Sequence, residues 1–474
     1  MDFDKAKRRQ SLKVIVSELI MVITVIITVV ILALLVSGYW LNENFEVERQ
    51  GMLQIYSTPT GADVAIDGES SWLQRTNTSK VLTSGEHTVT LTKDGYDSWS
   101  KTITITEGLL YRLHYPRLFP ENRTAETVLD VSGTTFATIS PDHNSLLLSN
   151  NTTKWGLVKL SSDTVTLQDI SVAGLFSDVQ LAAEAETGLF TGKILQVDWD
   201  RDGSHALFRV QSGDKLEWVL LDVKNIAKSL NLTREFNADF SDVQILDNSS
   251  SNLIVVENRN LRKIDVSGRS ISTVIVPSVV DVDHYNNEIV FSAAQPSSAA
   301  AADDSLPYYV GYLKTSDDAV TALASTPAPA KVAISRFYDQ KYITILTGDT
   351  VSVHLKDDFE DSVSYQIDFA PESLEVGHDG EFILMSAGTN IATLDMESST
   401  VSEWSVAGDS FDWLDNDMLY TVSDGQLIVY DYDGLNRRSL AANVSSRFPA
   451  GITDNKWLYY FSDDQLIREW LVEH

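Results

Sequence analysis

The sequence predicts an all-β chain, a small β-sandwich followed by an eight-bladed β-propeller, on a single N-terminal transmembrane helix. Three observations predict this fold class. They are an uncharged run near the N-terminus, a segment of short strands with Gly- and Pro-containing turns, and a turn-and-strand unit that recurs to the C-terminus. They divide the 474 residues into a basic cytoplasmic tail (1–13), the helix (14–40), a spacer (41–52), the sandwich (53–119) and the propeller (120–474).

Composition excludes several classes of protein before any motif is considered. The chain has 36 Lys and Arg against 67 Asp and Glu, which gives a net charge of −31. A nucleic-acid partner is therefore excluded, because binding of phosphates requires a basic face. There is no Cys, so disulfides, thiol nucleophiles and Cys-ligated zinc or iron–sulfur sites are excluded as well.

The N-terminal apolar run predicts the transmembrane helix. Leu19 to Val36 carries no charge, and a helix of this length spans about 27 Å, close to the ~30 Å hydrocarbon core of a bilayer. Tyr39 and Trp40 follow at the position of an interfacial aromatic belt. The basic tail keeps the N-terminus inside, so we expect a single-pass plasma-membrane protein with the bulk of its chain extracellular.

Two alternatives remain open for this run at the level of the sequence. A cleaved signal peptide has a shorter apolar core, of about 7–15 residues, although Val36-Ser37-Gly38 resembles a weak cleavage site. A buried globular helix is the second alternative, but a run of β-branched residues without a polar face suits lipid better.

Residues 53–119 alternate between short strands and turns. Leu53 to Tyr56 and Ala62 to Ile66 have the period of two that is typical of strands, and Asp67-Gly68 is a hairpin-type pair between strands. Further strands follow at His87 to Thr92 and at Trp99 to Ile105. The segment therefore predicts a small sandwich of antiparallel strands.

The order of these turns resembles the PEGA domain family. The name-giving Pro-x-Gly-Ala corresponds to Pro59-Thr60-Gly61-Ala62, with Thr in place of Glu at the second position. The other residues on the pattern are Asp67, Gly68, Gly85, His87, Gly95 and Tyr96. The resemblance implies a small envelope-associated β domain without catalytic residues. His87 lies in a predicted strand, where a structural role is favoured over a role as ligand.

From about residue 126 the same unit recurs eight times. Each copy places an Asp- or Asn-containing turn before an apolar strand, and a further apolar strand follows. The turns begin at Asp142, Asp202, Asn248, Asn286, Asp339, Asp379, Asn416 and Asp454. This spacing is typical of four-stranded propeller blades, so we expect eight blades, with seven as the alternative.

The last copy has room for only three strands before the C-terminus. Glu126 to Val131 precedes the first copy as a strand without a partner, and we expect it to complete the last blade and close the ring. The repeats resemble those of TolB-like and WD-repeat-like propellers, through Ser140-Pro141-Asp142 and through Trp199 to Gly203. A likeness of this kind implies the fold and leaves the function open.

One motif raises the question of a metal. Asp198, Asp200 and Asp202 have the Asp-x-Asp-x-Asp-Gly spacing that begins a calcium loop. Such a loop needs a bidentate carboxylate at its twelfth position, which is Arg209 in this chain. A structural turn is therefore the favoured interpretation, and these three aspartates are the candidate metal ligands.

No catalytic motif stands out, and no cofactor is expected. The chain has no His-Glu-x-x-His, no Gly-x-Ser-x-Gly elbow and no phosphate-binding loop. We therefore predict a non-catalytic envelope protein whose propeller binds another surface protein or a glycan. The alternative is an extracellular propeller enzyme acting on glycans or peptides. Three or more carboxylates, His or Arg converging with shifted pKa values in the channel mouth favour the enzyme, and a smooth channel with an acidic or aromatic rim favours binding.

Overall fold

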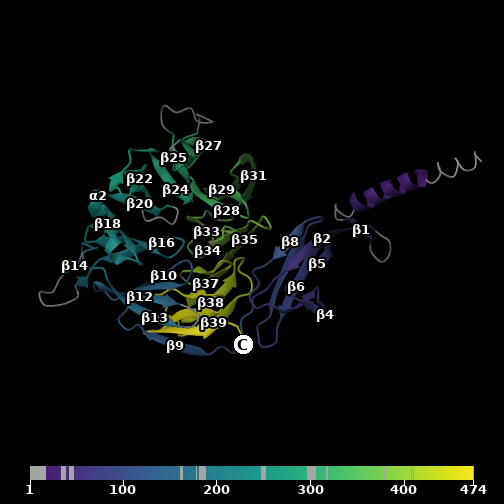
Figure 1. The fold of residues 1–474 in the computed structure, drawn as a ribbon, viewed down its shortest axis with the longest axis horizontal. Helices are drawn as coiled ribbons and strands as arrows, with labels where there is room; N and C mark the ends of the chain where they lie inside the picture. Colours follow the sequence, from purple (N-terminus) through teal and green to yellow (C-terminus); the bar gives the residue numbers. More distant parts are fainter. Residues whose placement is uncertain are drawn as a thin grey trace, which may run out of the picture. The chain divides into compact units, whose positions relative to one another are not determined.

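A computed structural model shows how these segments fold. It describes residues 18–33, 39–41, 47–160, 164–177, 179–180, 188–246, 252–295, 306–316, 319–377, 379–406, 408 and 410–472. The chain forms two compact units that divide between Asn122 and Arg123, and each unit is described by itself (Figure 1).

The prediction of a transmembrane helix over 14–40 is wrong. The helix that the structure describes covers 18–33, including Leu19, and 16 helical residues span about 24 Å, less than the ~30 Å hydrocarbon core. Tyr39 and Trp40 belong instead to the strand β1 (Tyr39–Leu41), which pairs with β2 (Val47–Ile55). Within the residues that the structure describes, none of the helices is both long and apolar enough to cross a bilayer.

The predicted single-pass location in the plasma membrane is corrected by the same finding. The basic tail over 1–13 and Val36 lie outside the described residues.

The described part of the first unit contains two four-stranded sheets. One has the order β4 (Glu69–Arg75), β3 (Asp63–Ile66), β6 (Gly85–Thr92), β7 (Trp99–Ile105). The other contains β1, β2, β5 (Thr78–Thr83) and β8 (Leu110–Leu113), and β8 runs parallel to β2.

Alternate residues of both sheets form the core of this unit. Leu53 and Ile55 are buried on β2, and Leu91 and Trp99 are buried on β6 and β7. A side chain at Gly51 of β2 would lie 2.4 Å from the carbonyl oxygen of Thr106, directly after β7. The chain thus approaches β2 too closely there for any residue larger than glycine.

The described part of the second unit contains eight four-stranded antiparallel sheets, here called blades 1 to 8. Blades 1 to 4 are β10 (Phe136–Ile139), β11 (Ser145–Ser149), β12 (Lys154–Leu160), β13 (Val165–Ser171); β16 (Lys193–Trp199), β17 (His205–Ser212), β18 (Lys215–Asp222), β19 (Leu230–Asn231); β20 (Phe240–Ile245), β21 (Asn252–Glu257), β22 (Asn260–Asp265), β23 (Ser270–Ile271); and β24 (Val279–Tyr285), β25 (Glu288–Ala294), β26 (Tyr308–Lys314), β27 (Thr321–Thr326).

Blades 5 to 8 continue in the same order. They are β28 (Lys331–Phe337), β29 (Gln340–Thr347), β30 (Thr350–Leu355), β31 (Asp358–Gln366); β32 (Ser373–Val376), β33 (Phe382–Ala387), β34 (Asn390–Asp395), β35 (Thr400–Ser405); β36 (Asp412–Asp415), β37 (Met418–Ser423), β38 (Gln426–Asp431), β39 (Arg438–Ala442); and β40 (Gly451–Thr453), β41 (Trp457–Ser462), β42 (Gln465–Trp470) with β9 (Ala125–Asp130). Between blades 1 and 2 a short pair forms from β14 (Val179–Gln180) and β15 (Leu189–Phe190). A 3₁₀ turn (Ile226–Lys228) and the helix α2 (Leu232–Phe236) flank β19.

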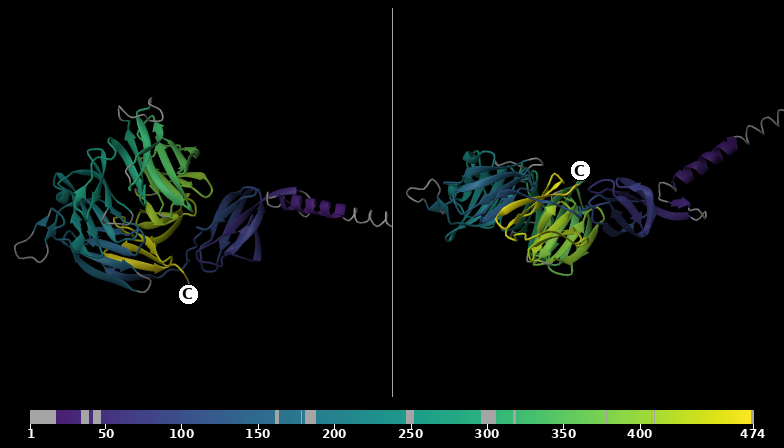
Figure 2. Two further views of the ribbon diagram at one scale, coloured as in Figure 1. Left: turned by 45° about the horizontal axis from the view of Figure 1, so that its top comes forward. Right: turned by 90° about the horizontal axis from the view of Figure 1, so that it is seen from below.

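The ring closes with the strand that the sequence left without a partner. β9 pairs antiparallel with β42, and Leu129 lies opposite Leu466. In Figure 1 the blue β9 lies beside the yellow end of the chain, and Figure 2 shows the blades following one another from blue through green to yellow. Because β9 supplies the fourth strand of blade 8, the predicted closing strand is confirmed, and the strand pairing favours eight blades over seven.

The core of the ring lies between neighbouring blades. On β11, Leu146 and Leu148 pack in one cluster with Tyr459 of blade 8, whereas Leu147 packs in another with Phe208 of blade 2. Equivalent clusters join blades 2 to 7 in sequence. Successive residues of a strand face opposite sides of its sheet, and both sides are covered here, so the middle strands are apolar at consecutive positions.

Candidate functional site

The first strand of each blade lines the centre of the ring, and several of these strands alternate valine with acidic or amide residues. On β24, Asp281 and Asp283 flank Val282, and on β20, Asp242 and Gln244 flank Val243. Both valines are buried in the clusters between blades. With the valine held in the core, the period of two turns its polar neighbours away from that cluster.

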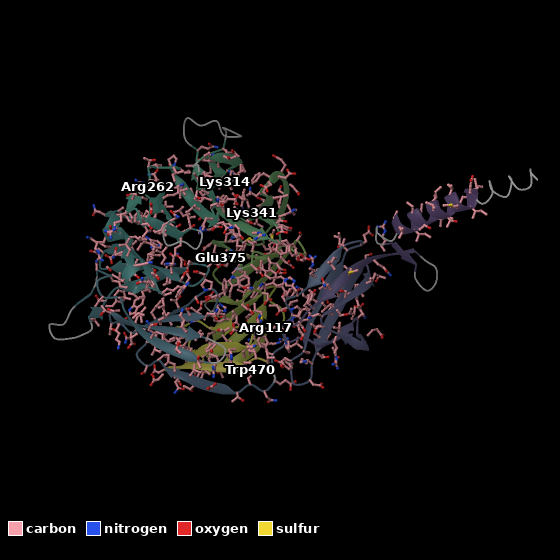
Figure 3. The ribbon with its side chains drawn as sticks, in the orientation of Figure 1. Arg117, Arg262, Lys314, Lys341, Glu375 and Trp470 are labelled. Carbon is pink, nitrogen blue, oxygen red and sulfur yellow. The ribbon has the colours of Figure 1, made fainter. Side chains whose placement is uncertain are left out.

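A cavity of about 670 Å³ lies among the first strands of blades 2 to 6. Its walls carry five carboxylates that the turns of the chain do not use, and we call this cavity the acidic channel. The five are Asp198 on β16, Asp242 on β20, Asp281 and Asp283 on β24, and Glu375 on β32. Figure 3 labels Glu375 near the middle of the ring. Residues from four blades thus meet at one place.

Two of these carboxylates satisfy the unpaired edge of the neighbouring blade. The backbone N–H groups of Val332 and Ile334, on β28, donate to Oδ2 of Asp281 and to Oδ2 of Asp283, each at 2.8 Å. The inner edge of a blade has no further strand to pair with, so side-chain acceptors replace the missing ladder. Asp281 and Asp283 therefore hold blades 4 and 5 together at the channel wall.

Side-chain amides bind two other carboxylates. Gln196 Nε2 donates to Asp198 at 2.7 Å, and Gln244 Nε2 donates to Asp242 at 3.1 Å. Gln244 Oε1 in turn lies 3.1 Å from Nδ1 of His284. Burial lowers the pKa of His284 to about 4, so this imidazole is neutral at pH 7 and adds no positive charge to the channel.

The carboxylates of the acidic channel are harder to ionise than ordinary ones. Burial raises the pKa of Asp283 to about 7, even though the Ile334 N–H favours the charged form. Burial, followed by the charge of Asp242, raises the pKa of Asp198 to about 6. Burial also raises the pKa of Glu375, to which the charge of Asp412 adds. Water in the channel still reaches Asp198 and Glu375, whose side chains are exposed within it, so hydration is reduced there but not lost.

Positive groups offset only part of this negative charge. Burial raises the pKa of Asp242 and of Asp281, while the nearby Arg209 and Lys331 respectively work against that rise. At the rim, hydrogen bonds from two further arginines outweigh the effect of burial and lower the pKa of Tyr285. These arginines are Arg201, whose guanidinium lies 5.3 Å from the centre of the Tyr285 ring, and Arg336. Arg336 is also paired with Asp339, its Nη2 lying 2.9 Å from Oδ1, so its charge is balanced by an acidic neighbour.

A second cavity of about 470 Å³ adjoins the acidic channel, and Gln196 and Trp199 line both. We call it the apolar chamber. Its apolar wall consists of Phe136, Ile194, Leu195, Phe411 and Phe448. Asp412 and Arg447 also line it, so this cavity carries one acidic and one basic residue, and burial raises the pKa of Asp412.

The structure separates the three candidate metal ligands. Asp198 lies on β16, whereas Asp200 and Asp202 lie in the turn that follows, directly before β17, which begins at His205; of the three, Asp198 and Asp200 line the acidic channel. One ligand atom from each of Asp200, Asp202 and His205 lies within 4.8 Å of the others. The sequence analysis missed His205, whose only signal is its position directly after a repeated turn.

The Asp200 carboxylate is already bound within its own turn. Its Oδ1 accepts the backbone N–H groups of Ser204 and His205, each at 2.8 Å, and its Oδ2 lies 2.6 Å from Nδ1 of His205. The hydrogen bond to Asp200 raises the pKa of His205, despite its burial. Arg209, at the twelfth position of the loop, lies on β17 and offers no carboxylate. The arrangement is that of a blade turn.

The motif residues of the first unit make turns and core contacts. Gly61, Gly68, Gly85 and Gly95 have positive φ, as does Asp67. Ala62 and Tyr96 are buried. Pro59 lies between β2 and β3.

His87 has a partner for each ring nitrogen. Its Nδ1 lies 2.7 Å from Oδ2 of Asp67, and its Nε2 lies 2.8 Å from the carbonyl oxygen of Thr83. Burial lowers the pKa of His87, but these hydrogen bonds outweigh it and the net shift is upward. Asp67 also accepts the backbone N–H of Thr88, which ties the β3–β4 turn to β6.

Five acids of the two cavities were not predicted from the sequence: Asp242, Asp281, Asp283, Glu375 and Asp412. The repeated pattern consists of the turns and the apolar strands that follow them, whereas these acids lie on the first strands of blades 3, 4, 6 and 7. The available signal was the alternation Asp-Val-Gln-Ile at 242–245 and Asp-Val-Asp-His at 281–284.

Comparison with known proteins finds one family match, which lies within the first unit. The PEGA domain family matches residues 50–117, and no curated protein sequence matches the chain. Among solved structures, the C-terminal WD40 domain of Sif2 is similar at 13% identity and a TM-score of 0.46, over 74% of this chain and 99% of that one.

Two further solved structures show a similar degree of likeness. An oligogalacturonate lyase in complex with manganese has 14% identity and a TM-score of 0.39, over 59% of this chain and 89% of the lyase. Apo AztD from Citrobacter koseri has 9% identity and a TM-score of 0.38, over 80% and 94%. At such values the assignment of blades rests on the strand pairing described above.

Proposed function

We propose that the ring is a non-catalytic binding module whose acidic channel receives a cationic ligand. The observation that carries this proposal is the convergence of five carboxylates from four blades on one cavity. The pKa values of Asp198, Asp283 and Glu375 are raised first by burial and then by the negative charges of neighbouring carboxylates. A bound cation relieves that repulsion and replaces the hydration that the carboxylates lose in the channel.

The spacing of the carboxylates favours a ligand with several positive groups over a single metal ion. Within the described residues, the group of three ligand atoms close enough to hold one ion is that of Asp200, Asp202 and His205, outside this set of five. Charges spread along a channel suit amino or guanidinium groups spread along a chain. An anionic glycan, by contrast, is repelled by the same carboxylates and by the net charge of −31.

Isothermal titration calorimetry with spermidine and with trilysine tests this proposal. We expect both to bind at pH 8 and low salt, and we expect the affinity to fall as salt is added, because the attraction is between charges. Neutral oligosaccharides serve as the control and should give no heat of binding. Equal heats for spermidine and a neutral sugar, or no heat for either polycation, would contradict the proposal.

The convergence of carboxylates with raised pKa values also meets the condition stated above for an enzyme acting on glycans or peptides, which is therefore the second candidate. The carboxyl groups of Asp198 and Asp283, with pKa values of about 6 and about 7, change protonation near neutral pH, as a general acid or base requires. Incubation with panels of oligosaccharides and peptides, analysed by mass spectrometry, distinguishes the candidates. Products that disappear in an Asp283→Asn variant would favour the enzyme, and binding without turnover favours the binding module.

A further inference from the structure

The apolar chamber combines its apolar wall with polar lining residues, among them Asp412 and Arg447. The Leu195 side chain is 43% exposed there, and Phe136, Ile194, Phe411 and Phe448 are each only partly buried. An apolar wall that faces water is stabilised when a ligand covers it with apolar surface.

Asp412 is the acidic residue in the lining of this chamber, and Arg447 is the basic one. Oδ1 of Asp412 accepts the backbone N–H of Trp413 at 2.8 Å, and the described residues provide no further hydrogen bond to its carboxylate. The acceptor capacity that remains points to a ligand with a charged donor. The charge of Asp412 also acts on Glu375, so the two cavities form one electrostatic environment.

The two cavities meet at Gln196 and Trp199, so one ligand can occupy both. A simple polyamine has positive groups for the acidic channel but no bulky apolar group for the chamber. A peptide supplies both kinds of group from adjacent side chains, and its backbone can pass from one cavity to the other.

We propose that the ring binds a peptide segment in which aromatic or large aliphatic residues adjoin Lys or Arg residues. The apolar side chains occupy the apolar chamber, beside Leu195 and Phe411, and the basic side chains face Asp412 and the carboxylates of the acidic channel. This inference rests on the proposed function and adds to it the class of ligand.

The test compares two peptides and one polyamine by calorimetry on the full chain. The peptides are acetyl-Phe-Leu-Lys-Lys-Lys-amide and acetyl-Ser-Ser-Lys-Lys-Lys-amide, and the polyamine is spermidine. We expect the Phe-Leu peptide to bind about tenfold more tightly than the Ser-Ser peptide, because only the first buries apolar side chains.

Substitution of two leucines with similar exposed fractions tests whether the preference for the Phe-Leu peptide arises in the apolar chamber. Leu195→Ser should weaken the Phe-Leu peptide by about threefold to tenfold and leave the Ser-Ser peptide and spermidine unchanged. Leu216→Ser, on β18, is the matched control: Leu216 is 40% exposed but lines neither cavity, so all three affinities should be retained.

The outcomes separate the two proposals. Equal affinity for both peptides, or a Phe-Leu preference that survives Leu195→Ser, would overturn this inference while the binding of spermidine upholds the proposed function. Failure of all three ligands to bind would overturn both.

Discussion

At the scale of single residues, the channel carboxylates combine two roles that pull in opposite directions. Asp283 accepts the backbone N–H of Ile334 and so stabilises the wall, yet it is held where its charge is poorly hydrated. An amide side chain keeps the acceptor and removes the charge. Asp283 is therefore the residue at which the two roles can be separated by one substitution.

Asp283→Asn should stabilise the protein at pH 8 and have little effect at pH 4. The folded state raises the pKa of Asp283 from 3.8 to about 7, so it holds a proton that the unfolded state releases. The contribution of this group to the free energy of unfolding is fully present below pH 3.8 and is lost as the pH rises to about 7. We expect a gain of about 1–3 kcal/mol at pH 8, since water in the channel reduces the full effect.

Denaturant unfolding at both pH values measures this gain. Asp358→Asn, an exposed substitution on β31, is the control and should change little at either pH. The charges of neighbouring Asp281 and Asp242 add to the rise in the pKa of Asp283, so the comparison of variant with control matters more than the absolute slope. The same difference in free energy of unfolding between variant and control at pH 4 and at pH 8 would contradict this explanation of Asp283.

A second prediction concerns the aspartates that resemble a calcium loop. Both Asp200 oxygens are engaged by Ser204 and His205, so we expect millimolar Ca²⁺ to leave the thermal midpoint unchanged within about 1 °C. Differential scanning calorimetry with Ca²⁺ and with EDTA checks this. A rise in the midpoint that is abolished by Asp202→Asn would establish a cation site instead.

At the scale of elements, the ring depends on one strand from the beginning of the unit pairing at its end. Arg123 reinforces that junction. Its Nε lies 3.1 Å from Oε2 of Glu469 on β42, and its Nη2 donates to the carbonyl oxygen of Leu440 at 2.7 Å. Glu469 also accepts the hydroxyl of Tyr460 at 2.7 Å. One guanidinium thereby joins blades 7 and 8 next to the closing strand.

Arg123→Ala should destabilise the second unit by about 2–4 kcal/mol, because it leaves the buried Glu469 carboxylate without its cation. Chemical denaturation measures the loss. Lys154→Ala removes a cation from an ion pair with Asp169 whose side chains are both more than half exposed, and it should cost about 0.5 kcal/mol or less. Similar losses in the two variants would show that Arg123 has no special role in closure.

The elements that the sequence predicted best are those whose signal is local. The turn at Asp142 and the apolar strand after it recur in register, so the blades and the closing strand follow from the chain itself. For the acids of the channel, the one local signal in the sequence is their alternation with valine. Asp198 and Glu375 lie 177 positions apart, and ring closure brings them into one cavity, which no short pattern records.

The N-terminal segment shows a different limit of sequence patterns. Hydropathy identifies an apolar run, but it does not fix where the helix ends. The described helix covers 18–33, and Tyr39–Leu41 pairs as a strand with β2, so the expected interfacial aromatics belong to a sheet. Pairing with β2 supplies hydrogen-bond partners for the backbone groups of Tyr39–Leu41, and the hydropathy of the segment does not predict such pairing.

At the scale of the whole molecule, acidic residues lie both on the surface and in the cavity among blades 2 to 6. A net charge of −31 attracts cations from a distance, and the channel offers them carboxylates in reduced hydration. The central claim is that these particular carboxylates, rather than the overall charge, bind the ligand. Two triple variants with the same change in net charge separate these possibilities.

The channel variant is Asp198→Asn, Asp283→Asn, Glu375→Gln. The surface variant is Asp214→Asn, Asp358→Asn, Glu360→Gln, in which all three side chains are exposed outside both cavities. The deciding measurement is the affinity of each variant for spermidine at pH 8 by calorimetry. We predict a loss of at least about tenfold in the channel variant and a change within about twofold in the surface variant, and equal losses in the two would contradict the account.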